Sequence, residues 1–311
     1  MTGPSADLSC VACGGTTEVA GHGVIAPFIA SLIHIPVGQP SELRRCLECD
    51  LGYFDYRYDE SEMSLLYGGY RGPEYSSVRH HWEPWYSAKV NDANAAGNEA
   101  VRDRLEFMTG ILRRAGVPDE LDYAVDFGGD EGQFFPDIPI KHKLVCDMSD
   151  RAVAPDVERI AELSVLADKT VDLVIVAHVL EHLSDPRAPL AEIREIIGDE
   201  GILYVEVPLD RARLRAFHAS DRYRSYLHWV SARRIPFILM DFLTGIWRQF
   251  ERRLPPFGVI KQSEHINYFD AASVRSLLRA SGFRIIAERH DPGAKAGGLR
   301  IGRYGVAARP D

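Results

Sequence analysis

The sequence has few cysteines and no long uninterrupted hydrophobic run. Five cysteines occur among 311 residues, and four of them fall into two pairs. The longest apolar run of the C-terminal half, residues 235–247, is interrupted by Asp241. It is shorter than the roughly 20 residues that a bilayer-spanning helix needs. Because a secretory signal pattern is also missing at the N-terminus, we expect a cytoplasmic protein without stable membrane insertion.

Positive charge is also scarce. The chain has 36 Lys and Arg against 45 Asp and Glu, a formal net charge of −9. A large nucleic-acid-binding surface normally carries a basic footprint, so the composition argues against a nucleic-acid partner. With 46% hydrophobic and 26% charged residues, the chain has the balance of an ordinary globular protein. Its length suffices for one large and one small domain.

The paired cysteines form two Cys-x-x-Cys motifs. Their members are Cys10, Cys13, Cys46 and Cys49. Two such motifs predict four thiolates around one Zn²⁺, and a four-sulfur shell has no open position, so we expect a structural ion. His22 and His34 lie between the motifs and are alternative ligands, although an ordinary loop position is favoured. Cys146, in a predicted core strand, is expected to be a small buried apolar residue.

The most informative stretch begins at residue 123. An apolar run, residues 123–125, ends at Asp126, and three glycines follow: Gly128, Gly129 and Gly132. Glycines in such a turn let the backbone approach a ligand, and a helix after the turn would point free N–H groups at it. A second apolar strand ends at Asp147. That residue falls about 20 positions after Asp126, the offset at which a carboxylate meets a ribose hydroxyl in dinucleotide-type folds.

Further periodic segments predict an alternation of helices and strands. Apart from Asp172, the run 171–176 is apolar, as expected of a strand buried on both faces of a parallel sheet. We expect helices at 91–115, 150–163, 183–197 and 273–281, and strands at 164–167, 201–207, 283–288 and 303–308. The pattern predicts an α/β fold with a Rossmann-like sheet.

The motif Asp-x-Gly-Gly-x-x-Gly at 126–132, with Asp-Leu-Val-Ile-Val-Ala-His-Val-Leu-Glu-His-Leu at 172–183, resembles the class I S-adenosylmethionine-dependent methyltransferases. The resemblance covers about residues 100–290, and the glycine spacing disfavours an NAD enzyme. Many members have Asp-x-Gly-x-Gly-x-Gly, whereas Asp130 stands at the middle glycine here. The resemblance implies S-adenosylmethionine as cofactor. It implies these cofactor-binding residues: Asp126, Gly128, Gly129, Gly132, Asp147, Asp168 and His178.

The order of segments extends the resemblance. A zinc-binding module at 1–60, an aromatic linker or flap at 61–90 and a Rossmann-like domain at 91–311 are similar to zinc-containing sugar C-methyltransferases, which are generally longer. An insertion at about 209–262 mixes arginines with aromatic residues. We consider three roles for it: a helical cap, a substrate lid whose arginines bind phosphate or carboxylate, or a weak membrane-surface contact through residues 235–247.

Four residues are candidates for the chemistry. They are His265, His182, His178 and Glu264. An acceptor hydroxyl, or a carbon beside a carbonyl, must lose a proton, which requires a base. His265 is the preferred base, because residues 264–269 resemble a segment that re-enters the active site of many of these enzymes. His182 is expected to be hydrogen-bonded and structural. Metal ligation by His178 and His182 would lack an evident third ligand.

The leading hypothesis is a methyltransferase acting on a small polar metabolite, a sugar or nucleotide-linked sugar in a biosynthetic pathway. One alternative is an O-methyltransferase for an aromatic or lipid-like acceptor, favoured by the apolar insertion. The other is a non-catalytic binding module whose cofactor turn is spoiled by Asp130.

Overall fold

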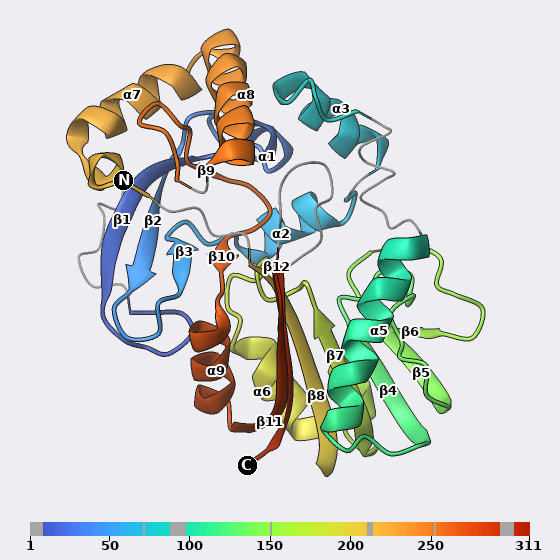
Figure 1. The fold of residues 1–311 in the computed structure, drawn as a ribbon. Coiled ribbons are helices and arrows are strands. Elements are labelled where there is room, and N and C mark those ends of the chain that lie inside the picture. Colours follow the sequence, from blue (N-terminus) through green and yellow to red (C-terminus); the bar gives the residue numbers. More distant parts are fainter. Residues whose placement is uncertain are drawn as a thin grey trace.

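The protein is represented by a computed structural model that describes residues 9–70, 72–87, 98–149, 151–209, 214–251, 253–292 and 302–311. A seven-stranded sheet has the order β11-β12-β8-β7-β4-β5-β6 (Figure 1). Its strands are β4 Leu121–Phe127, β5 Ile140–Cys146, β6 Glu158–Ile160, β7 Val171–Ala177, β8 Ile197–Leu209, β11 Phe283–Asp291 and β12 Gly302–Pro310. Strands β6, β5, β4, β7 and β8 are parallel, and β12 runs antiparallel between β8 and β11.

The central strand β7 is buried on both faces because helices cover the sheet from two sides. Leu173 and Ile175 pack with residues of α5 (Asn98–Arg114), whereas Val174 and Val176 belong to the core that includes α6 (Ala188–Ile196) and α9 (Ala271–Ala280). Figure 1 shows α5 on one side of the sheet and α6 and α9 on the other. This arrangement confirms the predicted α/β fold with a Rossmann-like sheet.

Several predicted elements are wrong in type or in bounds. The helix expected at 150–163 is absent from the described residues 151–163, where a loop leads into β6. Pro155 interrupts the helical pattern, and residues 158–160 complete the edge of the sheet instead. The strand expected at 164–167 is a 3₁₀ turn, Leu163–Leu166. The helix expected from 183 begins only at Ala188.

No helix follows the glycine turn either. Residues 128–139, all of them described, contain turns and coil, with Pro136 and Pro139 in the segment. The helix expected at 91–115 is α5, and the positions 91–97 lie outside the described residues. The expected helix at 273–281 and the expected strands at 201–207, 283–288 and 303–308 are confirmed, with somewhat wider bounds.

A second sheet joins the N-terminal segment to the insertion. Its order is β10-β3-β2-β1-β9, with β1 Thr17–Ile25, β2 Pro40–Cys46, β3 Gly52–Phe54, β9 Lys261–Gln262 and β10 Asn267–Tyr268. Strands β1 to β3 pair antiparallel, β9 pairs with β1, and β10 pairs with β3. Both edges of the N-terminal meander are therefore closed by residues more than 200 positions away. The predicted division at residues 60 and 90 stays a prediction.

Short helices surround this second sheet. They are α1 Pro27–Leu32, α2 Glu60–Tyr67, α3 Pro73–Trp82, α7 Asp221–Ser231, α8 Arg234–Phe250 and a 3₁₀ turn at Ala216–Ala219. The tyrosines Tyr58, Tyr75 and Tyr86 are buried in a cluster with α1. Within the described parts of the chain, no helix has the length and apolarity to cross a bilayer.

Arg57 connects the N-terminal segment to the loop that follows β7. Its Nη2 donates to the carbonyl oxygen of Leu183 at 2.6 Å, and its Nε donates to that of Ser184 at 2.9 Å. The Ser184 hydroxyl donates in return to the carbonyl oxygen of Tyr58 at 2.6 Å. Burial lowers the pKa of Arg57 to about 10. These contacts place the N-terminal segment over the carboxyl ends of the parallel strands, where ligands bind in open α/β sheets.

Candidate functional site

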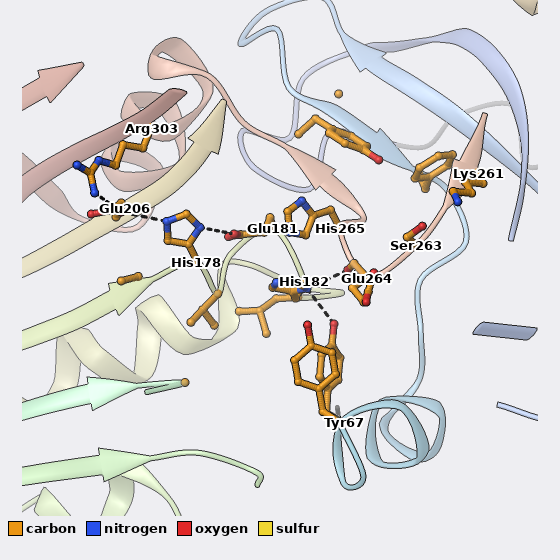
Figure 2. Close-up of a pocket in the computed structure, with 18 of the residues that line it drawn as sticks. Tyr67, His178, Glu181, His182, Glu206, Lys261, Ser263, Glu264, His265 and Arg303 are labelled. Carbon is orange, nitrogen blue, oxygen red and sulfur yellow. Dashed lines mark hydrogen bonds and ion pairs between the residues drawn. The ribbon is translucent and has the colours of Figure 1, made fainter. Parts of the chain in front are cut away.

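A large pocket of about 3090 Å³ lies where the glycine turn, the loop after β7, the segment 263–265 and the insertion meet. The predicted site residues that line it are Asp126, Gly128, Gly129, Asp147, His178, His182, Glu264 and His265. The structure thus brings nearly all the predicted cofactor-binding and catalytic residues to one cavity. Figure 2 shows the polar side chains around His178, His182 and His265.

The glycine turn after β4 leaves no room for side chains. Gly128 has φ +73°, and an added Cβ would lie 2.5 Å from the Val179 side chain. A Cβ on Gly129 would overlap the Asp126 carboxylate. Gly132 also has a left-handed φ of +74°, and its Cβ would press on Val145 and Val157 rather than on the pocket. The turn is therefore a cradle in which bare backbone faces the cavity.

Asp126 is a buried carboxylate without a full set of partners. It is 2% exposed, and its Oδ2 has no hydrogen-bond partner among the described residues. Burial raises its pKa to about 7, although the positive charge of Arg104 opposes the shift. A buried orphan acceptor at the mouth of a glycine cradle is what a ligand bearing N–H or O–H donors would satisfy.

Asp147 holds the turn in shape. Its Oδ2 accepts from the backbone N–H of Asp130 at 3.0 Å, and its Oδ1 accepts from that of Ser149 at 2.7 Å. The Asp130 carboxylate accepts from the Ser149 hydroxyl at 2.9 Å and from Arg151 at 2.7 Å. The φ of Asp130 is +49°, a left-handed value that aspartate tolerates better than most residues. Asp130 is thus accommodated in the turn at the position where many members of the resembled family have glycine.

The structure does not bring Asp168 to the pocket. Its side chain is 76% exposed and pairs with Lys169. The expectation placed Asp168 after a strand, but the strand in this region ends at Ile160. The acidic residue that follows this strand and lines the pocket is Glu162. Because the strand was predicted at 164–167 and is found at Glu158–Ile160, the acidic residue that follows it was predicted six positions too far along the chain.

His178 lies between two buried carboxylates (Figure 2). Its Nε2 is 3.0 Å from Oε1 of Glu206, and its Nδ1 is 3.4 Å from Oε1 of Glu181. Burial opposes the charged imidazolium, yet the two carboxylates raise the pKa of His178. The backbone of His178 has φ +59°, a left-handed value that turns the chain out of β7. His178 therefore links two carboxylates that favour its protonated form.

His182 is held in one orientation. Its Nδ1 lies 3.0 Å from the carbonyl oxygen of Glu264 and 3.0 Å from the Tyr67 hydroxyl. A carbonyl oxygen only accepts, so Nδ1 carries the proton and Nε2 is left as an acceptor. Burial and the nearby His265 lower the pKa of His182 to about 4. His182 is therefore neutral at physiological pH, in keeping with the structural role expected for it.

His265 reaches the centre of the polar cluster from the segment before β10. Its ring centroid is 4.8 Å from that of His182, and the ligand atoms of Glu181, His182 and His265 lie within 4.8 Å of one another. The segment is fixed because the backbone N–H groups of Ile266 and Asn267 donate to the carbonyl oxygen of Glu181 at 2.8 and 3.0 Å. This docking explains why a residue 83 positions beyond His182 stands beside it.

Glu181 is a site residue that the sequence reasoning missed. It is 1% exposed, and neither carboxylate oxygen has a hydrogen bond among the described residues. Burial would favour the neutral form, but His178, His182 and His265 together lower its pKa to about 2. Glu206 was not assigned a role either. The available signals were the position of Glu181 in the Leu-Glu-His run and that of Glu206 near the end of a strand, but neither position distinguishes a site residue from a packed one.

The negative charge of Glu264 is stabilised by two residues of the predicted aromatic linker at 61–90. Arg79 Nη1 donates to its Oε1 at 2.5 Å, and the Tyr75 hydroxyl donates to the same oxygen. Burial opposes ionisation, but Arg79 and Tyr75 hold the pKa of Glu264 below its usual value. The backbone carbonyl oxygen of Glu264 accepts from Nδ1 of His182, so Glu264 also helps to orient that ring.

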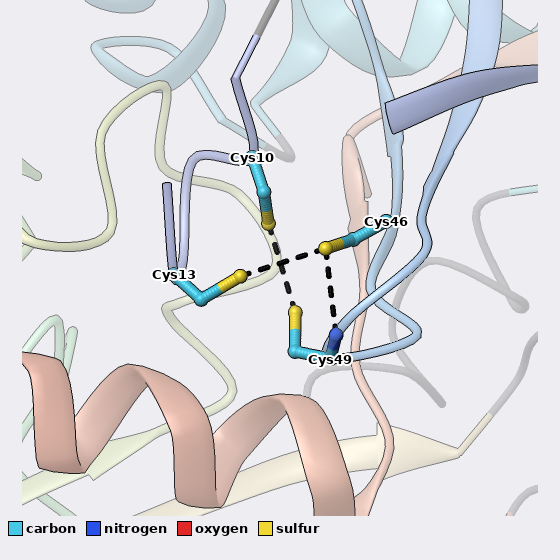
Figure 3. Close-up of side chains that lie close together, drawn as sticks. All are labelled: Cys10, Cys13, Cys46 and Cys49. Atoms are coloured by element: carbon cyan, nitrogen blue, oxygen red, sulfur yellow. Dashed lines mark hydrogen bonds between the residues drawn. The ribbon is translucent and has the colours of Figure 1, made fainter. Parts of the chain in front are cut away.

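The four paired cysteines converge at the N-terminal end of the second sheet (Figure 3). The Sγ atoms of Cys10 and Cys49 are 3.6 Å apart, and those of Cys13 and Cys46 are 3.5 Å apart. All four sulfurs lie within 4.8 Å of one another. Sulfurs placed tetrahedrally at about 2.3 Å from Zn²⁺ would be about 3.8 Å apart, close to these distances. The hydrogen bond with Cys49 lowers the pKa of Cys10 to about 5.

The other histidines and the fifth cysteine have separate environments. His22 lies in β1 with its Nδ1 3.4 Å from Glu42, and it does not join the sulfur cluster. His34 lies in a loop with φ +59°. Cys146 is buried at the end of β5, as expected, and it also lines the pocket; burial raises its pKa to about 11.

Comparison with known proteins gives one family and several structures. Residues 98–288 match the family described as "Methyltransferase domain". No curated protein matches the chain. N-methyltransferase NodS from Bradyrhizobium japonicum WM9 is 13% identical, covers 68% of this chain and 98% of its own, and has a TM-score of 0.38. The N-terminal domain of EvdMO1, crystallised with SAH and D-fucose, is 14% identical, with 67% and 83% coverage and a TM-score of 0.35. CalO1, a methyltransferase in calicheamicin biosynthesis, is 14% identical, with 72% and 58% coverage and a TM-score of 0.36.

Proposed function

The chain belongs to the methyltransferase domain family, and from this membership we propose that it is an S-adenosylmethionine-dependent methyltransferase for a small polar acceptor. The proposed acceptor is a sugar or a nucleotide-linked sugar of a biosynthetic pathway. The observation that carries the proposal is the meeting of the glycine cradle and the Glu181–His182–His265 cluster in one pocket. One part fits a nucleoside cofactor, and the other can remove a proton.

The cofactor half has the groups that S-adenosylmethionine would need. The bound cofactor would supply a methyl group on an electrophilic sulfonium. The bare backbone of Gly128 and Gly129 would lie against it, and the orphan Oδ2 of Asp126 would accept a hydrogen bond from it. Asp147, already at the end of β5, would meet the ribose hydroxyls. Glu162 is a further candidate for contact with the adenine of the cofactor, in place of Asp168.

The acceptor half supplies a base. We assign this role to His265, because its imidazole stands beside the buried carboxylate of Glu181 and the neutral imidazole of His182. A neighbouring carboxylate stabilises an imidazolium as it forms, so Glu181 would favour proton transfer from the acceptor to His265. His178 and Glu264 would act as positioning residues, since both are engaged with oppositely charged neighbours.

The lining of the insertion indicates the acceptor's chemistry. Arg215, Arg248 and Arg253 face the same pocket. Guanidinium groups bind phosphate and carboxylate groups through paired hydrogen bonds, which supports an anionic polar acceptor. Phe242 and Ile246 also line this part of the pocket. They favour the second candidate, an aromatic or lipid-like acceptor methylated on oxygen.

The cysteine cluster is proposed to bind one structural Zn²⁺. Four sulfurs at near-tetrahedral spacing support this assignment, and the backbone N–H groups of Ala12, Gly15 and Glu48 approach sulfurs at 3.4 Å. Such N–H groups stabilise metal-bound thiolates. The ion would hold the N-terminal end of the sheet that roofs the pocket.

Calorimetric titration of the zinc-replete protein with S-adenosylhomocysteine tests the cofactor site. We expect saturable binding that Asp147→Ala weakens by about tenfold or more, as removal of a charge-assisted hydrogen bond would. Asp168→Ala is the matched control and is expected to bind as wild type. A folded protein without any binding would overturn the proposal and favour the non-catalytic module.

Turnover tests the base. With nucleotide-linked sugars as acceptors and S-adenosylhomocysteine release as the readout, we expect His265→Ala to lower kcat by about 100-fold or more. Its affinity for S-adenosylhomocysteine should stay the same. His142→Ala, an exposed histidine on β5, is the control. Near-normal turnover of His265→Ala would remove His265 from the role of base.

A further inference from the structure

Helix α8 exposes a long apolar stripe. Six large apolar residues occur on the outer side of this 17-residue helix, at spacings of three and four that place them on one face. They are Ile235, Leu239, Phe242, Leu243, Ile246 and Phe250. Ile235 is 76% exposed and Phe250 is 82% exposed. A helix of a globular protein normally buries such a stripe against the core.

The inner face of α8 is mixed, because Phe237 is buried in the core beside two buried polar side chains. Asp241 is buried, and its carboxylate pairs with Lys261 at 2.6 Å. Thr244 is buried too, and its hydroxyl accepts from the backbone N–H of Val259 at 3.0 Å. These contacts fix which way the helix faces, because turning the apolar stripe inward would separate Asp241 from Lys261 and break the Thr244 hydrogen bond.

Neighbouring elements extend the apolar surface. Trp229, on α7, is 51% exposed, and Trp85, which precedes α5, is 38% exposed and contacts Phe242 with a ring-centroid distance of 5.6 Å. Tryptophans are favoured at the boundary between lipid and water, where an apolar body and a polar N–H are both accommodated. In Figure 1, α8 lies at the outer end of the molecule, away from the seven-stranded sheet.

The segment that contains α8 has a charge opposite to that of the whole chain. Residues 209–262 contain ten arginines and one lysine against four acidic residues, whereas the entire chain has a net charge of −9. Arg233 and Arg234 are exposed at the start of α8, and Arg253 is exposed just beyond its end. Exposed arginines at both ends of an apolar stripe match the headgroups of anionic lipids.

From the exposed apolar stripe of α8 and the arginines at its ends, we propose that α8 docks the protein onto the surface of an anionic lipid bilayer. The helix lies in the interfacial plane, with its apolar face among the acyl chains and its terminal arginines at the headgroups. The docking is peripheral, in agreement with the lack of a spanning helix among the described residues. This inference does not depend on the proposed methyltransferase activity.

The docking surface is continuous with the pocket. Phe242 and Ile246 belong to the exposed stripe and also line the cavity, as do Gly245 and Arg248 of the same helix. A protein docked through α8 therefore presents one opening of its pocket to the bilayer. A molecule carried on a lipid would enter the pocket from this side without leaving the membrane surface.

Co-sedimentation with large unilamellar vesicles tests the docking. We expect the full-length protein to bind vesicles of phosphatidylcholine with about one third phosphatidylglycerol, and to bind pure phosphatidylcholine about tenfold more weakly. The double variant Ile235→Ser/Phe250→Ser should lower the partition coefficient on anionic vesicles by about tenfold or more. Leu65→Ser/Val165→Ser, which removes two exposed apolar side chains elsewhere, should bind like wild type. Arg233→Gln/Arg234→Gln should weaken binding to anionic vesicles only.

The remaining outcomes overturn the proposal. The chosen side chains are mostly exposed, so we expect each variant to fold. Circular dichroism and zinc content check this. If the folded wild type does not bind anionic vesicles, the docking surface is not a lipid contact. If sedimentation velocity then shows a dimer that Ile235→Ser/Phe250→Ser converts to a monomer, a second copy of the chain covers α8. Equal binding of all variants would show that another surface contacts the vesicles.

Discussion

Asp126 is the residue whose charge state depends most on what fills the glycine cradle. In the free protein it is buried, and one of its oxygens has no hydrogen-bond partner among the described residues. A ligand donor placed on that oxygen would favour the ionised form and would reverse part of the pKa increase. Cofactor binding is therefore expected to release a proton when the pH is below 7.

The same residue predicts a pH-dependent stability. The pKa of Asp126 is raised to about 7 by burial, above its unfolded value of about 4, so the folded state binds the proton more tightly. The contribution of Asp126 to the free energy of unfolding therefore decreases as the pH rises from about 4 to about 7. Asp126→Asn cannot ionise. Its stability relative to wild type should be greater at pH 8 than at pH 5, by about 1–3 kcal/mol.

Urea denaturation of the two proteins at both pH values measures this difference. Asp168→Asn, which changes an exposed carboxylate, is the control and should show little change between the two conditions. A stability difference between Asp126→Asn and wild type that is equal at pH 5 and pH 8 would contradict the buried, protonated carboxyl.

At the scale of elements, the sequence predicted those features that a local residue pattern determines. Strand β7 was predicted because its residues are apolar apart from Asp172, and the glycine turn because its spacing is specific. Glu181 and Glu206 were not predicted as site residues, since their roles arise from His178, which stands between them only in the folded chain. The two-residue strands β9 and β10 are too short for any periodicity. They exist because β1 and β3 offer unpaired edges.

The four clustered cysteines are expected to stabilise the N-terminal segment through the proposed Zn²⁺. Cys13→Ser should reduce the zinc content from one ion per chain and lower the unfolding temperature by several degrees or more, because zinc binding is coupled to folding. Cys146→Ala is the matched control, since it removes the one cysteine outside the cluster. Metal content by mass spectrometry and thermal unfolding are the measurements. Full zinc occupancy in Cys13→Ser would argue against the four-sulfur site.

At the scale of the whole molecule, the two sheets are joined by contacts that lie far apart in sequence. Arg57 connects the N-terminal segment to the loop after β7, and the backbone N–H of Asn267 in β10 donates to the carbonyl oxygen of Glu181 in the same loop at 3.0 Å. We therefore expect zinc release and loss of tryptophan fluorescence to share one midpoint in a urea titration. Two transitions would show that the N-terminal segment unfolds independently.

The closure of the second sheet by β9 and β10 also bears on how the protein is made. During synthesis, the meander β1–β3 leaves the ribosome long before residues 261–268 exist. Its two edge strands must wait with free backbone N–H and C=O groups, a state that invites pairing with other nascent chains. The interval between translating residue 54 and residue 268 is therefore the period in which this protein is most exposed to misassembly. Slowing translation within that interval should lower the yield of native protein more than slowing it afterwards.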